Sequence, residues 1–326
     1  MPNIKDVAKK ANVSVATVSR VLNNKGYVDN HTRILVEQAI KDLNYVPNEV
    51  ARTLFRKSSK LIGIVLYDLK NEFFNEMISQ IESLIFDRGY QTMICTTGEN
   101  HERETYYFQA LATNKVAGLI ICSDVTSQGI NILPNIPTVS LERIIKDTIP
   151  SIDCDNVMGG YLAGKKLIAL GCCNILQFTG PLNLSSSCER SNGFLSALSD
   201  FSHIEVSSYE LDFNTFTREA ILTHLKNHPD VDGIFAASDK IAVNVMKCLN
   251  LLRRQTPEDV KIIGFDNVSI AELSTPTLST IAQPVAQMSK AAIDTLFELI
   301  NEEPVTELHK IIPVEFIERE STVVPG

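Results

Sequence analysis

The sequence has no uninterrupted apolar run near the ~20 residues that a membrane-spanning helix needs. Its first residues, MPNIKDVAKK, contain neither an apolar leader core nor a cleavage-site pattern, so we expect a cytoplasmic protein without a membrane partner. The chain has 326 residues, of which 44% are hydrophobic. At roughly 100–200 residues per domain, this predicts two or three globular domains with a substantial core.

The cysteines follow neither a disulfide nor a zinc pattern. There are seven, an odd number, and none forms a CxxC pair. Most lie in apolar runs such as MICTT and LIICS, where a cysteine is usually a small buried hydrophobe. We therefore expect no structural metal.

Catalytic patterns are also missing. The sequence shows no Ser-His-Asp order, nucleophile elbow or phosphate-binding loop, and its six histidines are scattered through mostly polar segments. We expect no catalytic residues, no cofactor and no enzyme activity. The alternative is an enzyme built on the same scaffold, which would need a reactive side-chain pair that the sequence does not display.

The net charge of −9 at first argues against a nucleic-acid partner. Residues 1–60, however, hold eleven Lys and Arg against five Asp and Glu, a balance of +6 that leaves −15 for the remainder. Such asymmetry predicts a basic head that contacts phosphates and an acidic body that stays away from them.

Apolar spacing in residues 3–43 predicts three short helices. Ser14 and Asp29 precede the second and third helices as candidate N-caps. The first and second helices are separated by only a few residues, the length of the turn in a helix-turn-helix motif. The expected core faces are Ile4, Val7 and Ala8; Val15, Val18, Val21 and Leu22; and Ile34, Leu35, Ala39, Ile40 and Leu43. Residues 1–46 therefore form the predicted helix-turn-helix domain, and residues 47–60, opening with Pro47, form a hinge helix and linker.

Beyond residue 60, apolar strands alternate with amphipathic helices such as 74–89 and 159–170. This alternation of strands and helices predicts two similar α/β lobes with parallel sheets. Strands are expected to begin at Leu61, Gln91, Gly118 and Thr138, and then at Asn174, Glu205, Gly233 and Lys261. We assign about 61–154 and 283–312 to an N-lobe and about 155–282 and 313–321 to a C-lobe. Ligands of open α/β sheets bind at the carboxyl ends of the strands, here in the cleft between lobes.

The segments IKDVA (4–8) and VSVATVSRVLN (13–23) closely resemble the lactose/galactose (LacI/GalR) repressor family of bacterial regulators. Residues 45–54 resemble the family's hinge helix, and LIGIV (61–65), DN..GG (155–160), ER..GF (189–194), GFD (264–266) and LSTI.QP (278–284) resemble its core. The resemblance spans nearly the whole chain and implies a periplasmic-binding-protein-like core. Within the family, the hinge and its surroundings look most like ribose operon repressors, and sucrose operon repressors share much of the match.

The resemblance places the second helix in the major groove of operator DNA. Small side chains at Val15 and Ala16 suit apolar contacts with bases, and Arg20 suits a forked contact with guanine, although Val15 facing inward and Arg20 touching only phosphate remain alternatives. Thr17, Ser19, Asn23, Tyr27 and Thr32 match positions that mostly contact phosphates. In the hinge, which includes Asn48 and Ala51, the resemblance implies that Leu54 inserts into the minor groove; the alternative is packing against its partner hinge.

A sugar site needs polar groups for hydroxyls and aromatic rings for the sugar faces. Candidates at the strand ends are Phe73, Phe74, Arg190, Asp239, Asp266 and Gln283. The resemblance implies that Arg190 and Asp266 bind the effector and that Phe73 or Phe74 stacks on it. Asp239 is alternatively a helix cap, and Phe74 is alternatively core or dimer packing.

These observations predict a homodimeric repressor of a sugar operon that binds a palindromic double-stranded operator and is released by a sugar or sugar phosphate, foremost ribose or its phosphate. The alternatives within the family are a sucrose- or fructose-responsive repressor and a corepressor-dependent regulator that answers to a nucleobase or a phosphoprotein. A periplasmic-type sugar carrier is a further alternative, against which the basic head argues. Because no leucine-heptad tail follows the last strand pattern, we expect a dimer rather than a tetramer.

Overall fold

The computed structural model describes residues 2–23, 26–45, 59–98, 100–122, 135–213 and 215–323. The chain divides into two compact units, Met1–Ser59 and Lys60–Gly326. Within the described residues, no helix is long and apolar enough to cross a membrane. All seven cysteines are free, and five of them are buried.

The first unit contains the three predicted helices, α1 (Ile4–Lys10), α2 (Val15–Asn23) and α3 (Asn30–Asp42). Each begins with a side-chain cap that satisfies backbone N–H groups of the first turn. Asn3 and Asp6 form a capping box on α1, the Ser14 hydroxyl accepts from Thr17 N at 3.1 Å, and Asp29 accepts from Thr32 N at 3.0 Å. Both caps expected from the sequence are therefore confirmed.

The core of this unit is small. Its buried members are Val7, Ala8, Ala11, Val18, Val21, Val36 and Ala39. Three residues expected on core faces are exposed instead: Val15 is 41% exposed, and on α3 the exposed fractions of Ile34 and Leu35 are 63% and 43%. Val36 is buried in their place, because α3 turns only one narrow side toward the other two short helices.

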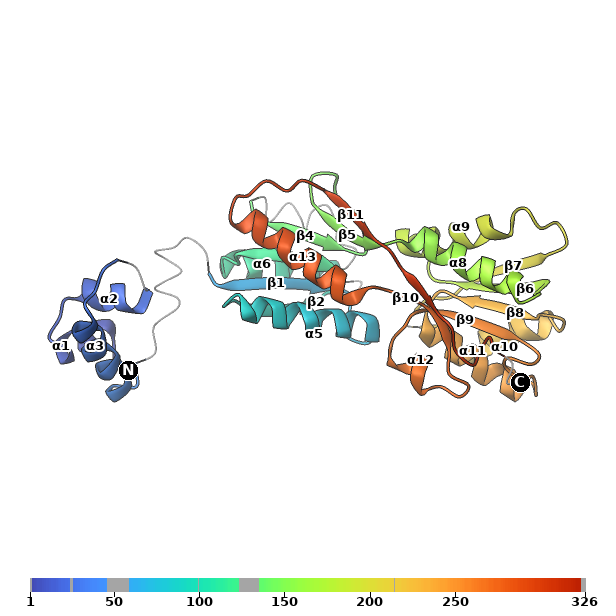
Figure 1. Cartoon of the computed structure of the whole chain (residues 1–326), viewed down its shortest axis with the longest axis horizontal. Helices are drawn as coiled ribbons and strands as arrows, with labels where there is room; N and C mark the ends of the chain where they lie inside the picture. Colours follow the sequence, from blue (N-terminus) through green and yellow to red (C-terminus); the bar gives the residue numbers. More distant parts are fainter. Residues whose placement is uncertain are drawn as a thin grey trace. The chain divides into compact units, whose positions relative to one another are not determined.

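The N-lobe of the second unit is built on a sheet with strand order β11-β5-β4-β3-β1-β2, in which all described pairings are parallel. Its strands are β1 (Leu61–Leu66), β2 (Gln91–Thr96), β3 (Gly118–Cys122), β4 (Thr138–Leu141), β5 (Ser151–Cys154) and β11 (His309–Ile312). Its helices are α5 (Glu72–Asp87), α6 (His101–Thr113) and α13 (Val285–Ile300), and α5 and α13 pack against each other beside the sheet (Figure 1).

The C-lobe repeats this arrangement with strand order β12-β10-β9-β8-β6-β7, where β12 alone among the described pairings is antiparallel. Its strands are β6 (Asn174–Thr179), β7 (Glu205–Glu210), β8 (Gly233–Ala236), β9 (Lys261–Asp266), β10 (Ser279–Ala282) and β12 (Glu315–Ile317). Its helices are α8 (Asn156–Ala169), α9 (Ser185–Leu198), α10 (Arg218–Asn227), α11 (Asp239–Leu251) and α12 (Ser269–Leu273). The expectation of two similar, mostly parallel lobes is confirmed.

Three connections pass between the lobes in the described part of the chain: residues 154–156, 282–285 and 312–315 (Figure 1). The sequence IIPVEFIER (311–319) spans the last of these connections. Pro313, which lacks an N–H for a strand ladder, divides it into β11 in one sheet and β12 in the other. Strands β5 and β10 were not anticipated at all.

Helices α8 and α9 pack at a backbone-to-backbone distance that only glycine allows. A Cβ at Gly160 would overlap the carbonyl oxygen of Arg190, and a Cβ at Gly193 would overlap that of Val157. This close approach fixes α9 against α8, and with it the side chain of Arg190, which points toward the cleft between the lobes.

Candidate functional site

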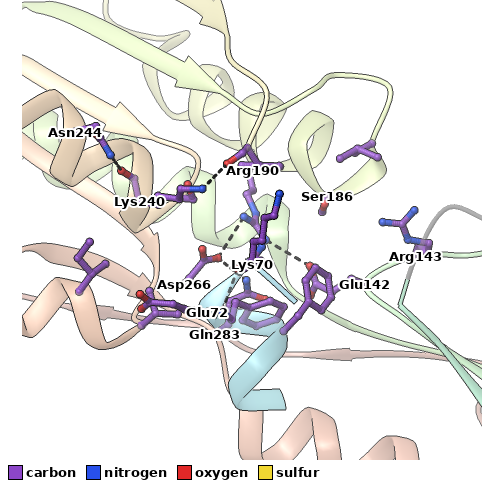
Figure 2. Close-up of a pocket in the computed structure, with 18 residues that line it drawn as sticks. Lys70, Glu72, Glu142, Arg143, Ser186, Arg190, Lys240, Asn244, Asp266 and Gln283 are labelled. Carbon is purple, nitrogen blue, oxygen red and sulfur yellow. Dashed lines mark hydrogen bonds and ion pairs between the residues drawn. The ribbon is translucent and has the colours of Figure 1, made fainter. Parts of the chain in front are cut away.

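A cavity of about 320 Å³ lies between the lobes, at the carboxyl ends of their strands. The N-lobe contributes the loop before α5 and Glu142 after β4. The C-lobe contributes Arg190 of α9 and Asp266 at the end of β9, and Gln283 lies on a connection between the lobes (Figure 2). Of the six predicted effector residues, the structure brings five together here: Phe73, Phe74, Arg190, Asp266 and Gln283.

Arg190 is the centre of the site and is 4% exposed. Its Nε donates to Asn156 Oδ1 at 2.8 Å, and its Nη1 donates to the carbonyl oxygen of Ala237 at 2.9 Å. The guanidinium also pairs with Glu142 and Asp266, each at 3.5 Å, and lies 3.7 Å from the centre of the Phe265 ring. The side chain is thus held in one geometry before any ligand arrives.

Two buried oxygens at the floor of this pocket have no hydrogen-bond partner within the described part of the chain. They are Glu142 Oε1 and Gln283 Oε1, on side chains that are 5% and 6% exposed. The other end of Gln283 is fixed, because its Nε2 donates to Asp266 Oδ1 at 2.7 Å. A buried acceptor without a donor costs about 1–3 kcal/mol, so the floor favours a ligand that supplies hydroxyl donors.

Burial perturbs both carboxylates. Desolvation raises the pKa of Glu142 to about 7, against the opposing effect of Arg190, and raises the pKa of Asp266 to about 6 in the same way. Perturbed carboxyls in a cleft are typical of functional sites. Among the described residues, no group of three His, Cys, Asp or Glu side chains has the geometry to hold a metal ion.

Asp239, the sixth predicted effector residue, does not line the cavity. It is fully buried, and its carboxylate accepts from Val268 N at 2.9 Å and from Thr280 Oγ1 at 2.6 Å. The helix-cap alternative was wrong as well, since the N-cap of α11 is Ser238. Asp239 instead ties down the turn after β9, where Asp266 has a φ of +117°. Asp239 therefore helps to position Asp266, which lines the pocket, without lining it itself.

The two phenylalanines differ in exposure. Phe73 is 2% exposed, while Phe74 is half-buried and meets it edge-on, with ring centroids 5.2 Å apart. Phe74 also lines a second cavity of about 520 Å³, which shares further walls at Asn71, Arg143, Leu184 and Phe213. It is therefore the ring available to stack on a ligand that lies between the two cavities.

In the first unit, the outward face of α2 carries the side chains expected to read DNA. Val15, Ala16 and Arg20 are exposed, whereas Thr17 and Ser19 are partly covered. The Thr17 hydroxyl is 2.9 Å from that of Ser14, and Asn23 donates to Ser19 O at 2.7 Å. Val15 thus does not face inward. Asn23 and Thr32 are partly exposed and Tyr27 is 91% exposed; Asn48, Ala51 and Leu54 lie outside the described residues.

Comparisons with known proteins match both units. Residues 3–48 match the bacterial regulatory proteins of the lacI family, and residues 165–322 match a periplasmic binding protein-like domain. The ribose operon repressor of Halalkalibacterium halodurans is 36% identical over 325 residues, covering 99% of this chain and 97% of that protein. The chain belongs to the LacI family. It is therefore a transcriptional repressor rather than an enzyme, as the sequence predicted.

Solved structures of LacI-family regulators agree with the fold. The Lac repressor dimer bound to operator and the anti-inducer ONPF has a TM-score of 0.88 at 26% identity, covering 99% of each chain. A LacI regulator from Alkaliphilus metalliredigens QYMF complexed with D-xylulofuranose has a TM-score of 0.75 at 35% identity, covering 82% of this chain and all of that one.

Several pocket residues of this LacI-family chain were not anticipated, namely Lys70, Glu142, Arg143, Ser186 and Lys240. For Glu142 the signal was present, because it directly follows the strand at Thr138–Leu141, and the same strand-end rule had selected Asp266. The others lie on helix starts and loops, where polar residues are common and sequence spacing does not separate a pocket wall from solvent.

Proposed function

We propose that the protein represses a sugar-utilisation operon by binding a palindromic operator as a homodimer in the cytoplasm, and that a small sugar bound between the lobes releases it. The proposed effector is ribose or its phosphate. Bases would be read by Val15, Ala16 and Arg20, with phosphate contacts from Thr17, Ser19, Asn23, Tyr27 and Thr32. Asn48, Ala51 and Leu54 would act in the minor groove.

One observation carries this proposal: the pocket joins the two lobes through a buried ion pair. Arg190 belongs to the C-lobe, its partner Glu142 belongs to the N-lobe, and both face a cavity with unsatisfied acceptors. A ligand that bonds to these groups must have different affinities for different lobe arrangements, which is the requirement for an allosteric effector. Coupling of this kind typically amounts to about 1–3 kcal/mol and acts reciprocally between ligand and operator.

The mechanism links three steps. The hydroxyls of the sugar would donate to Glu142 and Gln283, beside the Arg190–Glu142 ion pair that joins the lobes, and would thereby stabilise one lobe arrangement. The N-lobe strands follow directly on the linker from the head, so a change in that lobe alters the spacing of the two hinges in a dimer. Contacts of both heads with the two half-sites are then lost together.

The test is a mobility-shift titration on a family-like palindrome with ribose, ribose 5-phosphate, sucrose and fructose, each added separately. Release by ribose or its phosphate supports the proposal, and release by sucrose or fructose alone shifts the effector assignment to the sucrose-type alternative. Tighter operator binding on addition of a ligand would identify a corepressor instead. Failure of every sugar to change operator affinity would contradict the inducer mechanism.

The dimer is tested separately by sedimentation of the free protein and of its operator complex. Two heads are needed for the two half-sites of a palindrome, so the expected complex contains two chains per operator. A stable monomer or a tetramer would contradict this part of the proposal.

A further inference from the structure

The pocket has two ends of opposite chemical character. At its buried floor, the donors of Arg190 are directed at Asn156, Ala237 and the two carboxylates. Beside Arg190, two buried acceptors have no hydrogen-bond partner among the described residues, Glu142 Oε1 and Gln283 Oε1. A phosphate at neutral pH offers acceptor oxygens and a charge of about −1.5 to −2, so it does not fit at the floor, whereas hydroxyls do.

The rim of the same pocket is cationic. Lys70, in the N-lobe loop before α5, and Lys240, on α11 of the C-lobe, both line the pocket and are exposed. The exposed Glu72 is the acidic residue of this rim, and it accepts a hydrogen bond from Ser269 at 3.0 Å. Figure 2 shows Lys70 and Lys240 together with the buried Arg190–Asp266 pair.

Helix α9 adds hydrogen-bond donors at this rim. Its start, at Leu184 and Ser186, lines the pocket, and Leu184 supplies no side-chain hydrogen bond to cap the first turn. Ser187, in that turn, is 1% exposed, and its hydroxyl has no hydrogen-bond partner among the residues that the structure describes. Uncapped N–H groups and the positive end of the helix dipole favour an anion.

The second cavity, of about 520 Å³, is unfavourable for an anion because of the charges on its walls. Its walls carry four carboxylic side chains, Asp68, Glu104, Glu210 and Asp212, against one arginine, Arg143, and one histidine, His101. A negatively charged substituent that leaves the floor is therefore repelled from this cavity and attracted to the lysines of the rim.

We propose that the effector is a phosphorylated sugar, whose hydroxyls donate to the acceptors of the floor and whose phosphate binds at Lys70 and Lys240. This inference rests on the proposed effector site and adds the chemical class of its ligand. Because the two lysines belong to different lobes, one phosphate group joins the lobes at the mouth of the cleft, as Arg190 and Glu142 do at its floor.

The experiment is calorimetric titration of the full-length protein with matched pairs: ribose and ribose 5-phosphate, fructose and fructose 6-phosphate, sucrose and sucrose 6-phosphate. For the pair that binds, the phosphorylated member should bind at least about tenfold more tightly, since a hydrogen bond to a charged group reaches that size. This advantage should shrink as salt is added, because charges at an exposed rim are screened. In Lys70→Met and Lys240→Met, the affinity ratio within the pair should fall toward one.

The matched control is Lys226→Met, which removes an exposed lysine from α10, away from the pocket, and should retain the full ratio. Equal affinities within the binding pair, or a ratio that survives in both rim variants, would overturn the phosphate assignment while leaving the effector site in place. If no pair binds and none changes operator affinity, the proposed function itself fails.

Discussion

Arg190 on α9 lies 3.5 Å from Glu142 after β4, and this ion pair joins the two lobes through side chains that are only 5% and 6% exposed. Both side chains are almost fully buried, so their attraction is screened less than that of a surface pair. A buried ion pair therefore links the two lobes at the point where a ligand would bind.

Arg190→Ala should abolish the response to effector. Removing one partner of a buried pair leaves Glu142 and Asp266 without their cation, and we expect the core to lose about 3–5 kcal/mol of stability as well. Calorimetry and operator titrations with added sugar measure the response, and urea unfolding measures the stability. The control is Arg88→Ala, which breaks the ion pair with Asp294 outside the pocket and should leave the sugar response intact. A normal response in Arg190→Ala would mean that the pocket is assigned wrongly.

The stability of the unliganded core should fall as the pH rises from about 4.5 through about 7. The folded state holds a proton on Glu142 up to a pKa of about 7, whereas the unfolded chain releases it near 4.5, so in this window the folded state binds more protons. Asp266 contributes in the same direction between about 3.8 and about 6. Urea unfolding at a series of pH values measures the slope.

Glu142→Gln should flatten the upper part of this pH dependence, while Glu82→Gln, a change on the exposed side of α5, should not alter it. A slope between pH 6 and 7 that is the same in Glu142→Gln and the wild type would show that another group is responsible.

Asp239→Asn should weaken effector binding although Asp239 does not line the pocket. The amide has one accepting oxygen where the carboxyl has two, so either the Val268 N–H loses its acceptor or the buried Thr280 hydroxyl must turn from donor to acceptor, and either change loosens the turn that presents Asp266. We expect a loss of about 1–3 kcal/mol in binding, the cost of an unsatisfied buried group. Thr280→Val removes one of the two bonds and should have the smaller effect in calorimetry. An unchanged affinity in Asp239→Asn would argue against this positioning role.

Arg20→Ala should abolish the preference for operator over unrelated DNA. A forked contact with guanine is worth about 1–3 kcal/mol of discrimination, and Arg20 is exposed on α2 where such a contact is possible. Competition binding with operator and scrambled duplexes measures the ratio. Lys41→Ala, an exposed charge change on α3, should leave that ratio in place. A preserved ratio in Arg20→Ala would assign this side chain to phosphate contacts only.

The architecture was predictable because the long central strands are continuous apolar runs. Strands β1, β3 and β9 are almost fully buried and bounded by polar residues, which is the signature of a parallel sheet covered on both faces. β5 and β10 escaped prediction because they are four residues long and bury polar side chains. Ser151, Ser279 and Thr280 are all fully buried, and the hydroxyls of Ser279 and Thr280 are satisfied by hydrogen bonds.

Site residues could be predicted where they directly follow a strand. They could not be predicted where the direction of the side chain decides whether it reaches the pocket. Asp266 follows from the rule that ligands lie at the carboxyl ends of strands, whereas Arg190, on α9, was indicated by the resemblance to the family. Asp239 ends an equally convincing strand pattern, but its side chain turns behind the pocket toward Thr280, and no spacing in the sequence shows that direction. The same limit applies to Ile34, whose position on the helix face depends on how three short helices pack.

The three crossings between the lobes also determine the order in which the protein is completed on the ribosome. The N-lobe needs α13 and β11, which are synthesised only after nearly the whole C-lobe has been made. Domains of a nascent chain generally fold in the order in which they emerge. The helical head is contiguous and emerges first, whereas neither lobe is complete until residues beyond 309 have left the exit tunnel. A message truncated before that point would yield a DNA-contacting module with no finished receptor to control it.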